Sequence, residues 1–246
     1  MKDRTLVLKK KRRIIVCVVI IAVIIACILA LPAITPSPKV LTGEDGVRVV
    51  EIGSINGRPV QWIVLSEQPN GRKLVISRYV LYADTYNASL DKVTWKTCGL
   101  RKYLNGDFYN KTFSPIEKIH IKKTRIVNKD NPTKGTSGGE ETRDKLFLLS
   151  LEEVHEYFPF ESWDDERWIG SSRALDTKPL ETATMENYLM WEGEAPGNID
   201  NSSSWWLRTP GSIDNRYACL VDAGGSIRQT QTVNEMYGVR PAMWIK

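Results

Sequence analysis

The hydrophobic pattern opens with one long apolar run. Residues 14–34 read IIVCVVIIAVIIACILALPAI, which is 21 residues with one Pro and no charge. About 20 apolar residues are enough to cross roughly 30 Å of hydrocarbon, so this run predicts a transmembrane helix. Lys and Arg gather in residues 1–13. The positive-inside rule therefore predicts that this basic tail is cytoplasmic and that the rest of the chain is extracytoplasmic in the cell membrane.

Two other interpretations of the same run stay open. A cleaved signal peptide has an apolar region of about 7 to 15 residues, which this run exceeds, although residues 29–33 include small residues. Lipoprotein processing would use Cys27, but six of the next seven residues are apolar. Without processing, Cys17 and Cys27 are small apolar residues of a lipid-facing helix.

The pattern changes after the apolar run. Residues 35–46, TPSPKVLTGEDG, are rich in Pro, Gly and polar residues, which predicts a short stalk. The remaining residues, 47–246, have the usual length of one domain. All 8 Trp, 9 Tyr and 5 Phe follow the apolar run, as a packed extracytoplasmic domain requires.

The domain begins with segments typical of strands. Residues 47–52 and 60–65 are rich in Val and Ile, and Asn56-Gly57 between them is a strong hairpin signal. Residues 73–77 follow Asn70-Gly71 and predict a third strand. Together these segments predict a small antiparallel meander.

Helical spacing and helix-start signals come next. Leu100, Tyr103, Leu104 and Phe108 recur at helical intervals, and Gly106 lies where this helix would end.

Two capping boxes mark further helix starts. Ser114 to Glu117 contains a Pro at the first helical position. Ser150 to Glu153 is the second box, with Leu149 and Val154 placed as a hydrophobic staple. Residues 145–149, just before it, predict a buried strand.

Two polar segments separate these elements from the end of the chain. Residues 128–143 predict a surface loop or disordered insertion, and residues 192–204 a second long loop. Four strand-like runs close the chain, and Pro241 suggests an edge position or a bulge in the last of them. The runs are residues 205–209, 216–222, 226–232 and 239–245. Strands at both ends with helices between them predict an α+β domain whose ends come together.

Charge adds a restriction on partners. The chain has 34 Lys and Arg against 29 Asp and Glu, a net charge of +5. Seven of these bases and one acid lie in residues 1–34, so the remaining residues carry a net charge of −1. A basic nucleic-acid-binding body is therefore excluded, and we expect no nucleic-acid partner.

Familiar catalytic and metal-binding patterns are weak. Gly135-Thr136-Ser137-Gly138-Gly139 fits the G-x-S-x-G string of serine hydrolases, but its flanks lack the required strand and helix. The chain has 2 His, His120 and His155, and neither lies in a metal-ligand pattern. We therefore assign no catalytic residue, no metal and no cofactor.

Four stretches resemble a known bacterial family. Residues 100–119, 145–154, 205–211 and 238–245 closely resemble a membrane-anchored family catalogued as domain of unknown function 6273. The closing WWLR, Gly-rich hairpin and GVRPA pattern is also similar to the C-type-lectin-like fold shared with formylglycine-generating-enzyme domains. This second resemblance implies C-type-lectin-like antiparallel sheets with few short helices and long loops. The calcium-binding strings of sugar-binding C-type lectins are absent.

The resemblance raises a question about Cys98 and Cys219. A formylglycine-generating enzyme would bind copper with a cysteine pair, but neither residue matches that motif. An extracytoplasmic compartment also permits a disulfide between them. Two unpaired buried thiols are the alternative.

Trp206, Arg208, Asp222 and Arg240 form the candidate ligand-binding group. A planar arginine beside an aromatic ring can recognise sugar hydroxyls or carboxylates. The structural alternative is that an arginine pairs with Asp222 or another acid while Trp206 fills the core. The leading hypothesis is a single-pass, membrane-anchored extracytoplasmic binding module for a glycan or protein. An enzyme on the same fold and a purely structural surface scaffold are the alternatives. The sequence leaves the oligomeric state open.

Overall fold

The computed structural model describes residues 13–26, 38–42, 46–158, 174–175, 202–223 and 225–246. The chain divides into two units, Met1–Ser37 and Pro38–Lys246. In the first unit, residues 13–26 form a helix with exposed apolar side chains, and the remainder of the predicted span lies outside the described residues. Among the described residues, no helix is both long and apolar enough to cross a membrane.

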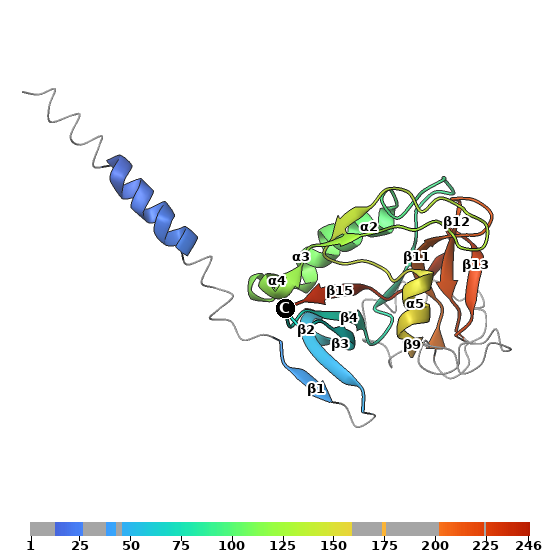
Figure 1. Cartoon of the computed structure of the whole chain (residues 1–246), viewed down its shortest axis with the longest axis horizontal. Helices are drawn as coiled ribbons and strands as arrows, with labels where there is room; N and C mark the ends of the chain where they lie inside the picture. Colours follow the sequence, from blue (N-terminus) through green and yellow to red (C-terminus); the bar gives the residue numbers. More distant parts are fainter. Residues whose placement is uncertain (1–12, 27–37, 43–45, 159–173, 176–201, 224) are drawn as a thin grey trace, which may run out of the picture. The chain divides into compact units, whose positions relative to one another are not determined.

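A six-stranded antiparallel sheet joins the two ends of the second unit. In spatial order it contains β1 (Val40–Thr42), β2 (Arg48–Ile55), β3 (Arg58–Glu67), β4 (Lys73–Ser77), β15 (Ala242–Ile245) and β6 (Ile121–Lys122). Figure 1 shows the last strand, β15, lying beside β4. The predicted approach of the two ends of the domain is therefore confirmed.

The N-terminal meander matches its prediction. Asn56 and Gly57 have φ of 51° and 77°, which a type I′ hairpin turn between β2 and β3 requires. One expectation was wrong: β1 lies inside the predicted stalk, residues 35–46, and pairs with β2, with Val40 opposite Val50. This part of the stalk is folded because β2 presents an open edge for pairing.

The second large sheet has five strands. Its order is β13 (Ile227–Thr232), β12 (Tyr217–Val221), β11 (Trp205–Pro210), β14 (Met236–Val239) and β5 (Tyr82–Thr85). β11 and β14 are parallel, and the other neighbours are antiparallel. Two small ladders pair β9 (Ala174–Leu175) with β10 (Ser202–Ser203), and β7 (Thr124–Ile126) with β8 (Thr142–Asp144).

Pro241 ends one strand and starts another. The sequence predicts one strand over residues 239–245, but β14 and β15 lie in different sheets. Proline has no N–H for a ladder and fixes φ, so pairing changes at Arg240-Pro241. β15 is an interior strand between β4 and β6, and the predicted edge position for Pro241 is wrong.

The first three helices of the domain follow one another along one side of it in Figure 1, and the last helix lies apart from them. α2 (Gly99–Tyr103), a π-helical turn (Leu104–Phe108) and α3 (Tyr109–Thr112) are continuous. The predicted stop at Gly106 is therefore wrong, since the chain widens into a π turn there. α4 (Pro115–His120) and α5 (Leu151–Tyr157) start at the two predicted capping boxes, and both boxes are present.

One of the two middle segments agrees with its prediction and the other does not. Residues 128–141 form a mostly exposed loop, which is one of the two alternatives predicted, and residues 142 and 143 belong to β8. The buried side chain of Asn131 attaches this loop to the domain, because it donates to Pro210 O (2.9 Å) and Gln229 Oε1 (3.0 Å). Residues 145–149 are mostly buried but form only one bridge, Phe147 with Ala242. Most of the predicted loop at residues 192–204 lies outside the described residues.

The second unit has its own core. Among the described residues, every buried hydrophobic side chain lies between Val49 and Ile245. The mainly antiparallel sheets and short helices confirm the α+β class.

Candidate functional site

The four residues predicted to bind a ligand do not form one surface. Trp206, Arg208 and Arg240 are 0%, 6% and 1% exposed. The Asp222 carboxylate, at the end of β12, accepts from Ser226 N (2.8 Å) and from Arg228 Nε (2.8 Å). Three of the four are therefore inside the domain.

Arg208 ties β11 to α5. Its Nη2 donates to Glu153 Oε1 (2.9 Å), and its Nη1 donates to Leu148 O (2.8 Å) and to the other Glu153 oxygen. The structural alternative proposed from the sequence therefore describes Arg208, but its acidic partner is Glu153 rather than Asp222.

Arg240 is buried without a carboxylate among the residues described. Its Nε donates to Ser77 O (2.9 Å), and its guanidinium lies 5.1 Å from the Trp205 ring and 5.6 Å from the Phe158 ring. Its Nη1 has no hydrogen-bond partner there. Burial lowers the pKa of Arg240 to about 9, because no counter-charge offsets the lost hydration.

Trp206 is buried, and it contacts two less buried residues, Asp84 and Tyr237. Its indole N–H donates to the backbone oxygen of Asp84 (2.9 Å). Its ring makes an edge contact with Tyr237, with centroids 4.9 Å apart and planes at 88°, and packs at 5.7 Å from Tyr86. Trp206 therefore contacts the backbone of β5 and the Tyr237 side chain on β14.

We call the following side chains the tyrosine–aspartate site: Tyr82, Asp84, Tyr103 and Tyr237. In the β5–β14 register, Tyr237 lies opposite Asp84 and Val239 opposite Tyr82. Opposite residues share a face, as do residues two apart on a strand. Tyr82, Asp84 and Tyr237 therefore project from the same face.

The helical segment over residues 99–112 completes the site. Tyr103 meets Tyr82 edge-on at 5.8 Å between centroids, and Phe108, from the π turn, lies 5.4 Å from Tyr82. Tyr103 is 37% exposed, whereas Tyr82, Asp84 and Tyr237 are half-buried. The site therefore has one accessible aromatic ring, that of Tyr103, beside three half-buried side chains.

Two polar groups of the site have spare hydrogen-bonding capacity. The Tyr82 hydroxyl is buried and has no hydrogen-bond partner within the described part of the chain. Asp84 Oδ1 accepts from Thr85 N at 2.8 Å. Since a carboxylate offers about four acceptor positions, Asp84 can accept more.

Burial controls the charge of these groups. Burial raises the pKa of Asp84, and the Thr85 N–H opposes this. Burial also raises the pKa of Tyr82, with smaller contributions from Asp84 and Tyr103. In this site burial therefore disfavours the charged form of the Asp84 carboxyl group and of the Tyr82 phenol. Such a site can exchange hydrogen bonds with a neutral hydroxyl compound.

Cys98 and Cys219 are both buried, and both are free thiols. Cys98 Sγ accepts from Arg101 N (3.4 Å) at the start of α2, and Cys219 Sγ donates to Pro210 O (3.2 Å). Burial raises the pKa of each thiol to about 12. Binding of a copper ion by this pair would require both thiols to lose their protons.

The other catalytic and metal patterns find no support in the described part of the chain. No group of three His, Cys, Asp or Glu that could hold a metal occurs among those residues. Ser137 lies in an irregular loop, where its hydroxyl accepts from Gly139 N (3.2 Å) and its carbonyl from Asn215 (2.8 Å). The strand and helix of a nucleophile elbow are not there.

Sequence reasoning reached Trp206 but missed the residues that it contacts. The alternation of Tyr82, Asp84 and Tyr86 is a usable signal, since residues two apart share a strand face. The pairing of β5 with β14, which brings Tyr237 to Asp84, joins residues more than 150 positions apart and leaves no local trace in the sequence.

The comparisons with known proteins give a family but no function. No curated protein and no solved structure matches this chain. A family model described as Domain of unknown function (DUF6273) matches residues 70–246. This range includes β5, β14 and the helical segment, and hence the whole tyrosine–aspartate site. The chain therefore belongs to the DUF6273 family.

Proposed function

We propose that residues 38–246 form a carbohydrate-binding module and that the tyrosine–aspartate site binds the sugar. The observation that supports this most is the buried hydroxyl of Tyr82, which has no hydrogen-bond partner among the described residues. The charge of Asp84 acts on this hydroxyl, and the exposed ring of Tyr103 lies against the Tyr82 ring. A ligand that supplies a hydroxyl would satisfy a polar group that otherwise costs about 1 to 3 kcal/mol.

The combination of side chains favours a sugar over other neutral ligands. Aromatic rings cover the apolar C–H faces of a sugar, and a carboxylate accepts from its hydroxyl groups. Tyr103 supplies an accessible ring and Asp84 the acceptor. The carboxylate of Asp84, on β5, disfavours a strongly anionic ligand, because like charges repel and such a ligand would need a positive site.

We further propose the location expected from the sequence. Residues 14–34 would anchor the chain in the cell membrane with the N-terminus in the cytoplasm, and the module would face outward. A C-type-lectin-like arrangement belongs to the same proposal, supported by the pairing of β4 near the start of the domain with β15 at its end. The fold itself does not determine the ligand, and the enzyme and scaffold alternatives have no observation that favours them.

Titration of residues 38–246 with soluble oligosaccharides tests this function. Trimers of N-acetylglucosamine, glucose and galactose would be added while calorimetry and tryptophan fluorescence are recorded. At least one trimer should bind and change the fluorescence, because Trp206 contacts Tyr237 and Asp84. Tyr103→Ala and Asp84→Asn should each weaken that binding at least about tenfold, a loss of 1.4 kcal/mol.

Tyr217→Ala is the matched control, since Tyr217 lies on β12, which β11 and β14 separate from β5. It should bind as the wild type does. Binding that Tyr103→Ala and Asp84→Asn leave unchanged would rule out the site. The absence of any calorimetric signal with all three sugars would rule out carbohydrate binding of this kind.

A further inference from the structure

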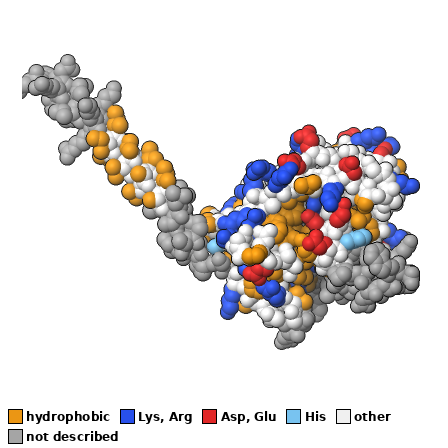
Figure 2. Space-filling view, viewed as in Figure 1, with side chains coloured by type: hydrophobic (Ala, Val, Ile, Leu, Met, Phe, Trp, Pro, Cys, Tyr) orange, Lys and Arg blue, Asp and Glu red, His pale blue; other side chains and the backbone are white. Residues whose placement is uncertain are grey.

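A second group of residues, on other elements, consists of lysines and arginines that have no acidic ion-pair partner among the described residues. We call it the basic surface: Arg72, Lys118, Lys122, Lys123, Lys145 and Lys246. Within the described residues, none of these cations forms an ion pair, whereas Lys73, Lys96 and Arg125 each pair with a glutamate. In Figure 2, Lys and Arg side chains gather on the side of the domain where α3 and α4 lie.

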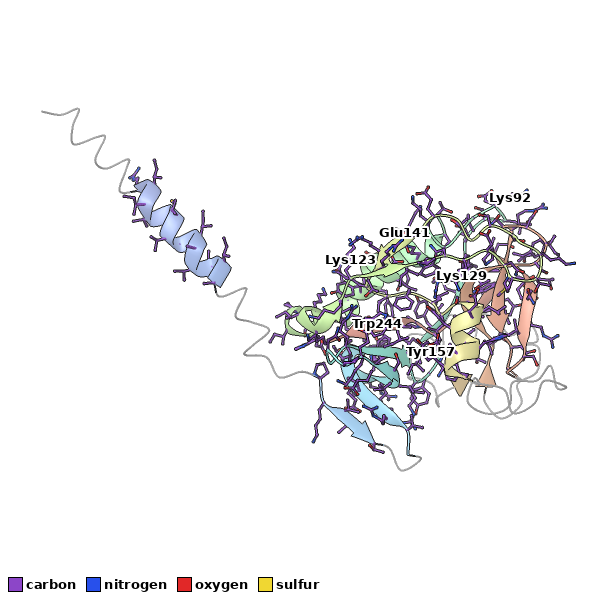
Figure 3. The ribbon with its side chains drawn as sticks, in the orientation of Figure 1. Lys92, Lys123, Lys129, Glu141, Tyr157 and Trp244 are labelled. Carbon is purple, nitrogen blue, oxygen red and sulfur yellow. The ribbon has the colours of Figure 1, made fainter. Side chains whose placement is uncertain are left out.

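One half of the basic surface surrounds Trp244, which is labelled in Figure 3. In the β15–β6 register Trp244 lies opposite Lys122, so both side chains project from the same face. The Arg72 guanidinium lies 5.1 Å from the Trp244 ring and donates to Thr124 Oγ1 (3.1 Å). Its Nε is buried with no hydrogen-bond partner among the described residues.

The other half surrounds the ring of Tyr109. The ammonium groups of Lys145 and Lys118 lie 4.0 and 5.1 Å from its centroid. Lys118 also donates to Asn110 Oδ1 (3.2 Å). The aromatic rings hold these cations in place, but they supply no negative charge.

The cations lie close enough to repel one another. Burial lowers the pKa of Lys122, and the charges of Lys246 and Arg72 lower it further. Burial also lowers the pKa of Lys145, and the charges of Lys118 and Lys123 lower it further. A bound anion would relieve this repulsion.

Acidic residues on the same elements are already engaged. Glu117 accepts from Ser114 N (2.8 Å) and Gly53 N (2.7 Å), and Glu141 pairs with Arg125. The cations therefore remain available to an external anion.

The shape of the basic surface indicates what kind of anion fits. β6 is an edge strand of the six-stranded sheet. Lys122 ends this strand and Lys123 follows it, and successive side chains on a strand project to opposite faces. The cations therefore continue around the sheet edge. A flexible chain can follow such an edge, but a flat membrane surface can touch only one side of it.

We propose that the basic surface binds a linear polyanion whose charges are phosphodiester groups. Separate cations along a curved path suit charges repeated along a chain, and each contact releases a counterion. A nucleic acid is a poorer fit, because bases need exposed rings for stacking and Arg72 covers Trp244. This inference uses none of the residues of the tyrosine–aspartate site.

The test compares one phosphodiester in two forms. Residues 38–246 would be titrated with poly(glycerol phosphate) and with phosphatidylglycerol vesicles, which present the same group on a flat surface, at several salt concentrations. The polymer should bind, and the triple variant Lys122→Gln, Lys123→Gln, Lys145→Gln should lose at least tenfold in affinity. The slope of log affinity against log salt should fall by about 2, at about 0.7 per cation removed.

The matched control removes the same charge elsewhere. Lys102→Gln, Lys129→Gln, Lys134→Gln replaces three exposed lysines outside the basic surface and should keep wild-type affinity and salt slope. Equal losses in both triple variants would overturn the assignment, because net charge alone would then govern binding. No polymer binding at low salt, tighter binding to vesicles, or tighter binding to a single-stranded oligonucleotide would also overturn it. Circular dichroism of both variants would verify that they are folded.

Discussion

Asp84 is held half-buried on β5 with one hydrogen-bond donor to its carboxylate, the backbone N–H of Thr85. Such a position is costly for a charged group, because burial removes hydration that one donor replaces only in part. Residues in binding sites often carry this kind of cost, since stability and function compete at the same position.

Asp84→Asn is therefore expected to stabilise the folded domain at neutral pH. In the folded state burial raises the pKa of Asp84 above its ordinary value of 3.8. The cost of the buried charge is fully present above the raised pKa and disappears as the pH falls below 3.8. The stabilising effect should therefore shrink as the medium is acidified.

Urea unfolding of wild type and variant from pH 7 down to pH 3.5 would measure this difference. Asp91→Asn is the control, because Asp91 is exposed and its carboxylate accepts from Ser89. A stability gain that stays constant over this range would contradict the assigned cause.

At this scale the sequence identified important residues better than it identified their roles. Trp206, Arg208 and Arg240 each contact a second element of the fold. The sequence pattern of a strand, however, does not distinguish a buried arginine from an exposed one. Arg208 forms an ion pair with Glu153, which lies 55 residues away in the sequence. No local rule predicts such a partner.

Among the elements, the two capping boxes allow a direct comparison. Each has serine as the cap and glutamate at the third helical position. In α4, Glu117 also accepts from Gly53 N (2.7 Å). In α5, Glu153 additionally neutralises the buried guanidinium of Arg208.

Glu153→Gln should therefore cost much more stability than Glu117→Gln. Glutamine preserves a capping box, but in α5 it leaves Arg208 buried without counter-charge, which costs about 3 kcal/mol. In α4 the loss should be about 1 kcal/mol, as for one weakened hydrogen bond. Guanidinium unfolding of both variants would give the two values. Equal losses would show that the ion pair adds nothing to the cap.

The same elements show where local signals succeed and fail. Caps and Asn-Gly turns were predictable, because each depends on the chemistry of two to four adjacent residues. Gly106 was misleading because a glycine can end a helix, but here neighbouring Leu104 and Phe108 are buried and hold the chain in a π turn. The loop at residues 128–141 was predictable from its polar composition, but the hydrogen bonds of Asn131 to β11 and β13 were not, because these partners are far away in the sequence.

For the whole molecule, the ladder of β4 with β15 is the decisive contact. Leu74 lies opposite Trp244, and Ile76 lies opposite Ala242. Met243 is fully buried. The interior of the six-stranded sheet therefore depends on four residues at the far end of the domain.

A chain that ends at Arg240 should fail to fold, whereas removing residues 1–37 should leave the melting temperature of the domain unchanged. The milder variant Met243→Ala should cost about 2 to 5 kcal/mol, as core truncations do. Circular dichroism and thermal melting would measure all three. A cooperative transition with wild-type midpoint in the shortened chain would show that β15 is dispensable.

The passage of the chain from β14 to β15 at Arg240-Pro241 also sets the order of events during synthesis. A ribosome releases residues from the N-terminus onward, so β4 and β5 emerge well before either of their C-terminal partners. Neither sheet can therefore be completed before residues 236–245 have been synthesised. The nascent chain is therefore expected to remain without its final tertiary structure until nearly the whole domain has been made.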